Sequence, residues 1–151
     1  MGSRRLKLDS VLSGLRGVDW ESLGVEWAVL FGGTAKRGEG RDIDLLVTYS
    51  GEAELDDVLR VVDVVSSVLG VEPDQVDVVV ASRAPCVIVA DAWRYGITVY
   101  SKRPKAPREW LLTRIIICHD YEISRRKLEI VAAAIKGVER RWGRHGHPIK
   151  A

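Results

Sequence analysis

The feature of this sequence that most constrains its fold is a set of four short apolar runs, rich in β-branched and aromatic residues. They cover residues 26–31, 43–49, 76–81 and 97–101. Each is short enough for one buried strand, and two of them stop directly at glycine or at Ser-Gly, which favours tight turns. Strands separated by longer helical stretches are typical of a mixed domain of strands and helices.

The stretches outside these runs fit helices. Residues 52–69 are rich in valine, but they are too long for one strand and their apolar positions follow one helical face that closes at Gly70. Similar spacing predicts helices over residues 6–15, 86–95 and 107–138, the last being one helix or two. By contrast, residues 34–41 are polar and interrupted by glycine, so we expect a loop there.

The composition is that of a globular protein, with 46% hydrophobic and 29% charged residues. No apolar run approaches the roughly 18 residues of a membrane span, and the first residues lack the apolar segment of a secretory signal. Cys86 and Cys118 are too few for a disulfide framework or a cysteine-based zinc site. We therefore expect a cytoplasmic protein, and the absence of asparagine favours a thermophilic source.

Three acidic residues stand at the starts of two of the expected strands. Asp42 and Asp44 are two positions apart, so both carboxylates leave the same face of the sheet. Asp77 opens the run Val-Asp-Val-Val-Val, where an acid among valines is costly unless something pairs with it. If the two strands are neighbours, the three carboxylates can converge on Mg²⁺ or Mn²⁺, ions that prefer oxygen ligands. Such a site suits phosphoryl or nucleotidyl transfer.

A glycine pair precedes these acids. Gly32 and Gly33 follow the first strand and let the backbone approach a phosphate, with the Thr34 hydroxyl as a further donor. Lys36 and Arg37 add positive charge nearby. Glycine pairs are also common in ordinary turns, and a basic loop is often only solvated. The order of the segments, from strand to glycine pair, basic turn, paired acids, helix and third acid, is the more specific signal.

This ordered set resembles the minimal nucleotidyltransferases of the DNA polymerase beta superfamily. The resemblance covers residues 26–100 and rests on residues 31–47, Phe-Gly-Gly-Thr-Ala-Lys-Arg-Gly-Glu-Gly-Arg-Asp-Ile-Asp-Leu-Leu-Val, with Asp77 downstream. It implies an α/β (α+β) fold, a mixed β-sheet flanked by helices with a C-terminal helical extension. We accordingly expect a nucleotidyltransferase-like domain over residues 1–103 and a helical extension with a loose tail over residues 104–151.

The resemblance also implies roles for individual residues. In that family a Gly-Ser pair grips the triphosphate, two acids bind the metal ions, and a third acid on the following strand completes the site. By position Gly32 matches the glycine, Asp42 and Asp44 match the pair, and Asp77 matches the third acid. Gly33 stands where the family has serine, so a hydroxyl must come from the next residue or be absent.

The function expected from this resemblance is transfer of a nucleotide monophosphate, AMP from ATP, onto an acceptor hydroxyl with Mg²⁺ as cofactor. Many minimal nucleotidyltransferases act as antitoxins beside a HEPN-type RNase toxin, some by attaching AMP to it, so the resemblance implies a protein acceptor. One alternative is a non-catalytic protein that neutralises its partner by contact. Another is a sugar transferase, for which the chain is short.

Charge is divided unevenly along the chain. Residues 1–100 carry 10 Lys and Arg against 16 Asp and Glu, and residues 101–151 carry 13 against 5, so the two parts have net charges of −6 and +8. The basic segment, including Arg125, Arg126 and Lys127, can be a solvated helix face, a nucleic-acid contact or a docking site for an acidic protein. Without aromatic residues interleaved among the basic ones, nucleic acid is not favoured.

Overall fold

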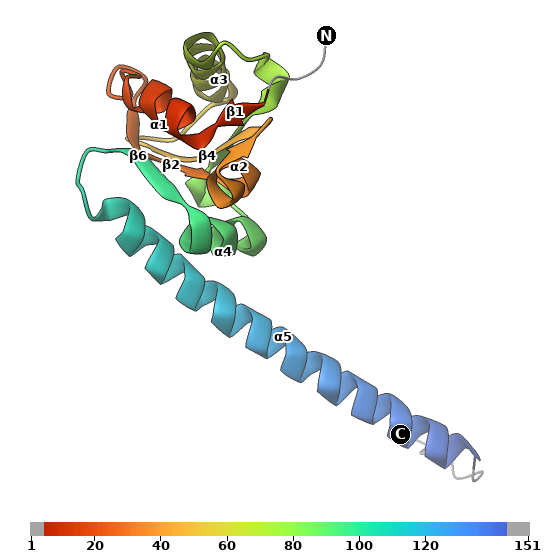
Figure 1. Ribbon diagram of the computed structural model, residues 1–151. Coiled ribbons are helices and arrows are strands. Elements are labelled where there is room, and N and C mark those ends of the chain that lie inside the picture. Colours follow the sequence, from red (N-terminus) through yellow and green to blue (C-terminus); the bar gives the residue numbers. More distant parts are fainter. Residues whose placement is uncertain (1–4, 145–151) are drawn as a thin grey trace. The chain divides into compact units, whose positions relative to one another are not determined.

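The computed structural model describes residues 5–144 and is built around a four-stranded sheet with helices on both faces (Figure 1). Its strands are β2 (Val25–Phe31), β4 (Ile43–Tyr49), β5 (Val76–Val80) and β6 (Ile97–Ser101), in the spatial order β5-β4-β2-β6. The pairs β2–β4 and β2–β6 are antiparallel, whereas β4 and β5 are parallel. The sheet is therefore mixed, which confirms the expected fold class.

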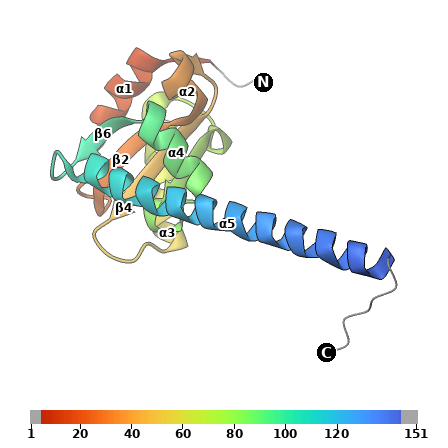
Figure 2. The ribbon, with the colours of Figure 1, turned by 90° about the horizontal axis from the view of Figure 1, so that it is seen from below.

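Four long helices accompany the sheet: α1 (Leu8–Arg16), α3 (Leu55–Leu69), α4 (Cys86–Tyr95) and α5 (Ala106–Arg144). α1 and α3 cover one face of the sheet, and α4 lies against the other face, as the views in Figures 1 and 2 show. α5 is a single helix, so residues 107–138 form one helix and not two. The part of the expected tail beyond residue 144 lies outside the described residues.

The strand alternation of β4 separates a core from a functional face. Ile43, Leu45 and Val47 are fully buried in the hydrophobic core shared with α1 and α3. Because neighbouring side chains of a strand point to opposite faces, Asp44 and Thr48 lie on the other face, where α4 packs. Burial of the alternating apolar side chains fixes the register of β4, since a slip of one residue would exchange the two faces.

Residues 34–41 are not the loop that the sequence predicts. α2 (Gly32–Arg37) is a short helix that ends at Gly38, whose φ of 82° is left-handed. Directly after it, β3 (Glu39–Gly40) pairs with β1 (Leu6–Lys7) in a second, two-stranded sheet. Two glycines lower helix propensity, which is why the pattern indicated a loop. Contacts with the rest of the fold stabilise α2 instead.

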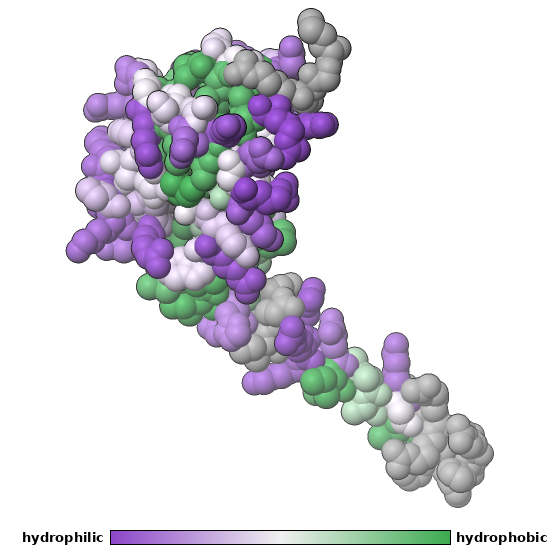
Figure 3. All heavy atoms as spheres, viewed as in Figure 1, coloured by the Kyte–Doolittle hydropathy of each residue, from purple (hydrophilic) through white to green (hydrophobic). Residues whose placement is uncertain are grey.

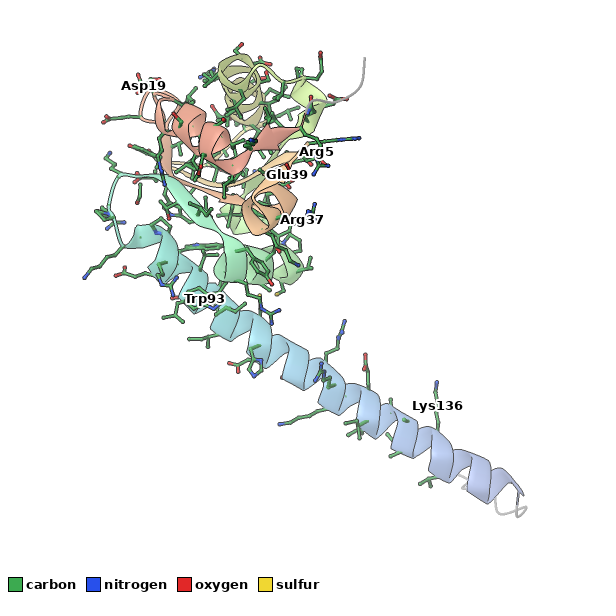
Figure 4. The ribbon with its side chains drawn as sticks, viewed as in Figure 1. Arg5, Asp19, Arg37, Glu39, Trp93 and Lys136 are labelled. Carbon is green, nitrogen blue, oxygen red and sulfur yellow. The ribbon has the colours of Figure 1, made fainter. Side chains whose placement is uncertain are left out.

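The side chains labelled Arg5 and Glu39 in Figure 4 form an ion pair between the residue before β1 and the first residue of β3. Their guanidinium nitrogen and carboxylate oxygen lie 3.0 Å apart. Both side chains are about half exposed, and exposed pairs of this kind contribute about 0.2–1 kcal/mol. The pair therefore adds little to stability, and the small sheet depends mainly on its backbone hydrogen bonds.

The chain divides into two compact units, Met1–Ile115 and Ile116–Ala151. The described part of the second unit is the remainder of α5, and Figure 3 shows hydrophobic residues at intervals along this helix. Seven of its large apolar side chains are more than 40% exposed: Ile116, Ile117, Leu128, Ile130, Val131, Ile135 and Val138. No described helix is long and apolar enough to cross a membrane.

Candidate active site

Two of the predicted acids meet at one end of the sheet. Asp44 of β4 and Asp77 of β5 are directly opposite each other in the parallel register, and their side chains are hydrogen-bonded. On its other side Asp44 is opposite Phe31, the last residue of β2. The alternation of two neighbouring strands therefore brings together two carboxylates from positions far apart in the sequence.

Asp44 is electrostatically strained. The pKa of its carboxyl is raised from 3.8 to about 6, first by partial burial and then by the nearby charges of Asp77, Asp42 and Asp91. A hydrogen bond that the protonated Asp44 carboxyl donates to the Asp77 side chain acts in the same direction. A carboxyl group surrounded in this way ionises only at a free-energy cost, which a bound cation would offset. The site is therefore suited to a positive ligand.

Gly32 closes one side of this site because its backbone approaches Asp44 too closely for any side chain. Its φ is 78°, and a Cβ atom there would lie 2.2 Å from Asp44 Oδ2. The Gly32 N–H donates to Asp91 Oδ2 at 2.9 Å. Glycine is thus required at this position both for the left-handed backbone and for the close approach of the carboxylate.

Asp91 is the site residue that sequence reasoning missed. It lies on α4, 59 positions from Gly32, and it holds the glycine turn through the hydrogen bond to the backbone. The only local signal was one acid within the apolar stretch Cys-Val-Ile-Val-Ala-Asp-Ala of α4. Nothing in that stretch indicates a long-range partner. Only the packing of α4 against the sheet brings Asp91 to the site.

Thr34 does not hold its hydroxyl toward the open side of the site. The residue is 1% exposed, and its Oγ1 donates to the backbone oxygen of Asp42 at 2.7 Å. This placement disagrees with the prediction that the Thr34 hydroxyl contacts a phosphate. Its contribution is to fix the backbone at Asp42, where the chain enters β4.

The basic residues of α2 lie in two different environments. The Arg37 guanidinium lies against Gly33, where a Cβ atom would be 2.3 Å from Arg37 Nη2, and Figure 4 shows Arg37 extending from α2. The Lys36 ammonium lies over the ring of Tyr95, 4.8 Å from its centroid. Arg37 therefore occupies the space that a serine side chain would take at position 33.

The donor set fits a hard divalent cation. All the nearby ligand atoms are carboxylate oxygens, as Mg²⁺ prefers, and a cation would relieve the strain on Asp44. Within residues 5–144, however, no three His, Cys, Asp or Glu side chains are already arranged around one metal position. The Asp42 side chain is exposed, so its rotation toward Asp44 and Asp77 is the change that would complete a set of three ligands.

The arrangement of a glycine turn beside carboxylates on a mixed sheet agrees with a family match. Residues 21–105 match the family model described as polymerase beta, nucleotidyltransferase. The chain belongs to this family, which confirms the resemblance seen in its sequence. No curated protein matches the chain.

Several solved structures with the same fold are chains of toxin–antitoxin complexes. One, from a toxin–antitoxin complex with AMP-PNP, is 16% identical with a TM-score of 0.60, over 85% of this chain and 99% of that chain. A second, from tri-AMPylated Shewanella oneidensis HEPN toxin in complex with MNT antitoxin, is 15% identical with a TM-score of 0.57, over 83% and 95%. A third, from the toxin–antitoxin MntA-HepT, is 15% identical with a TM-score of 0.56, over 83% and 96%. At these identities the likeness shows the fold.

Proposed function

We propose that this protein is a Mg²⁺-dependent nucleotidyltransferase that moves AMP from ATP onto an acceptor hydroxyl. The observation that carries this proposal is the raised pKa of Asp44, about 6, among neighbouring carboxylates and beside a glycine turn. Family membership over residues 21–105 supports the class of reaction. Mn²⁺ and another nucleoside triphosphate are the closest substitutes for Mg²⁺ and ATP in this scheme.

Each carboxylate has a role in the proposed reaction. Asp42, Asp44 and Asp77 hold Mg²⁺, which when bound supplies positive charge for the phosphate oxygens. Asp77 also accepts the proton of the acceptor hydroxyl. The acceptor oxygen then bonds to the α-phosphorus of ATP as the bond to pyrophosphate breaks, and pyrophosphate leaves.

The nucleotide phosphates bind over the glycine turn in this proposal. Gly33 has no side chain, and the Arg37 guanidinium lies directly beside its backbone. A guanidinium presents several donors in a planar fork, which suits phosphate oxygens. Lys36, the residue before Arg37 on α2, adds a second positive charge, and its ammonium lies over Tyr95. Gly32 serves by holding the turn against Asp44.

The acceptor in this proposal is a HEPN-type toxin, which the chain neutralises as an antitoxin. Support comes from similar structures whose names include a HEPN toxin carrying AMP groups beside an MNT antitoxin. The exposed apolar residues of α5 after Ile115 give such a partner a surface to contact. An extended apolar face of this kind is uncommon on a protein that acts alone.

The test combines purification with a transfer assay. The tagged chain is purified from its source cells, and the mass of any co-purified partner is measured before and after incubation with ATP and Mg²⁺. We expect a gain of one or more AMP units, lost when Asp44→Asn replaces the native chain and kept with the exposed control Asp74→Asn. A mass gain that persists in Asp44→Asn would contradict the assignment.

A second candidate is a non-catalytic antitoxin that acts by contact. It is favoured by glycine at position 33 and by the burial of the Thr34 hydroxyl, which together leave the turn without a free hydroxyl. Isothermal titration with ATP and Mg²⁺ separates the two functions. Saturable binding that disappears with EDTA and in Asp44→Asn supports the enzyme, and absence of binding supports the second candidate.

A further inference from the structure

The face of the sheet that carries Asp44 also forms a small cavity at the opposite end of β4. Thr48 lies four residues beyond Asp44 and on the same face, a separation of about 13 Å along a strand. Beside Thr48 there is a cavity of about 230 Å³, between the end of β4, the turn η2 (Ala81–Arg83) and the start of α5. The cavity is therefore separate from the carboxylates but within reach of one acceptor molecule.

Thr48 brings an unpaired polar atom to this cavity. Its Oγ1 is buried, and it has no hydrogen-bond partner among the described residues. A buried hydroxyl without a partner costs about 1–3 kcal/mol. The residue lines the cavity, so a turn of its side chain toward the cavity would let a polar group placed inside relieve this cost.

Arg83 brings a positively charged donor group to the same cavity. Its Nη2 donates to the backbone oxygen of Ala53 at 2.8 Å, which fixes the orientation of the guanidinium. A guanidinium has five N–H donors, so one bond leaves others for a ligand. In the described part of the chain, no carboxylate forms an ion pair with Arg83.

Trp110 forms an apolar wall of the cavity and is held in place from two sides. The Trp110 ring contacts the Trp27 ring, with centroids 5.6 Å apart. The Arg114 guanidinium lies over the Trp110 ring, 5.1 Å from its centroid. Trp27 is in turn the cross-strand neighbour of Thr48. The apolar wall gives the methylene groups of a ligand side chain a surface to contact, while Arg83 is exposed and open to its charged end.

We propose that this cavity is an acceptor subsite that binds one carboxylate of an acidic side chain on the protein acceptor, with Arg83 and Thr48 as donors. This inference rests on the proposed function, because it assumes an acceptor whose hydroxyl reaches Asp77. The volume suits a single side chain. Glu52 at the lining repels anions, so the cavity accommodates one carboxylate beside Arg83 rather than a polyanion such as RNA. The subsite therefore selects an acidic residue near the modified hydroxyl.

The binding test uses a small probe and needs neither metal nor nucleotide. N-acetylglutamate α-amide is titrated into the full chain, and chemical shifts of Thr48 and of the Trp110 indole are followed by NMR. N-acetylglutamine α-amide is the matched neutral control, and inorganic phosphate tests the other source of anionic oxygens. We expect saturable shifts with the glutamate probe alone.

Two variants assign the donors. Arg83→Gln should weaken binding of the glutamate probe by more than about tenfold, because it removes a charge-assisted pair. Thr48→Val removes the hydroxyl but keeps the shape of the side chain. It should therefore weaken binding of the glutamate probe and raise the midpoint of unfolding. The stability gain shows that the variant is folded and that its hydroxyl lacked a partner.

Equal shifts with the glutamine probe, or unchanged binding in both variants, would overturn the subsite. Tighter binding of phosphate than of glutamate would show an adventitious ion only, and it would equally overturn the inference. If the native chain binds the probe but transfers no nucleotide, the proposed function is contradicted instead. The two failures are therefore distinguishable.

Discussion

At the scale of single residues, Asp44 connects chemistry to stability. Its pKa of about 6 in the folded protein lies above the value of 3.8 for a free side chain. Between these values the folded state retains the proton that the unfolded state releases, so in the absence of metal the stability contribution of Asp44 falls as the pH rises from about 4 to 6. Above pH 6 the folded protein carries the full cost of an ionised carboxylate among its neighbours.

The corresponding prediction compares Asp44→Asn with the native chain in the absence of Mg²⁺. The variant should be more stable at pH 7, and its advantage should shrink as the pH falls toward 4, because the native carboxyl is then protonated in the folded state. Urea unfolding at pH 4, 5, 6 and 7 measures this difference. Asp74→Asn, at an exposed position, is the control. A constant difference between the native chain and Asp44→Asn over this range would contradict the prediction.

The adjacent glycines should respond differently to substitution. Gly32→Ala places a side chain in a left-handed backbone and 2.2 Å from Asp44 Oδ2, so it should destabilise the fold by about 2 kcal/mol or more. At Gly33 a new Cβ meets only the end of the flexible Arg37 side chain. Gly33→Ser should therefore change the free energy of unfolding by less than about 0.5 kcal/mol. Urea denaturation measures the free energy of unfolding of both variants. A similar loss of stability in Gly32→Ala and Gly33→Ser would contradict the prediction.

At the scale of elements, α2 depends on contacts outside itself, and Thr34 is its anchor to β4. Thr34→Val keeps the shape but leaves the Asp42 carbonyl without its donor, which should lower stability by about 1–2 kcal/mol. Thr34→Ser keeps the donor and should lose less. If the hydroxyl only fixes the backbone, nucleotide affinity measured with Mg²⁺ is the same in both variants. A fall in that affinity for Thr34→Val alone would return the hydroxyl to direct phosphate binding.

At the scale of the whole molecule, the charge division bears on the choice of partner. The excess of +8 in residues 101–151 has no part in the proposed chemistry, so we expect it to speed encounter with an acidic partner, an effect that weakens as salt screens it beyond about 10 Å at 0.1 M. Changing Arg125, Arg126 and Lys127 together to Glu should slow association and reduce its salt dependence. Stopped-flow mixing with the co-purified partner at several salt concentrations measures both. An unchanged rate and salt slope would make this segment a solvated face.

The sequence by itself determined the strands. The runs predicted over residues 43–49 and 97–101 agree with β4 and β6 to the residue, because short apolar runs between turn residues are a local signal. Alternation along the runs over residues 43–49 and 76–81 allowed Asp44 and Asp77 to converge if their strands were neighbours, and the parallel pairing of β4 with β5 supplies that condition. The family resemblance followed from the order of these same segments, and the family match confirms it.

Only the tertiary structure decided which groups these residues contact. Asp91 reaches the Gly32 N–H across 59 positions, and the Thr34 hydroxyl turns inward to Asp42, although the sequence pattern suggested an open loop. The cavity beside Thr48 likewise needs Arg83 and Trp110 from separate elements. The physical reason is that periodicity records which face a side chain leaves, whereas hydrogen-bond partners and cavities depend on how distant elements pack.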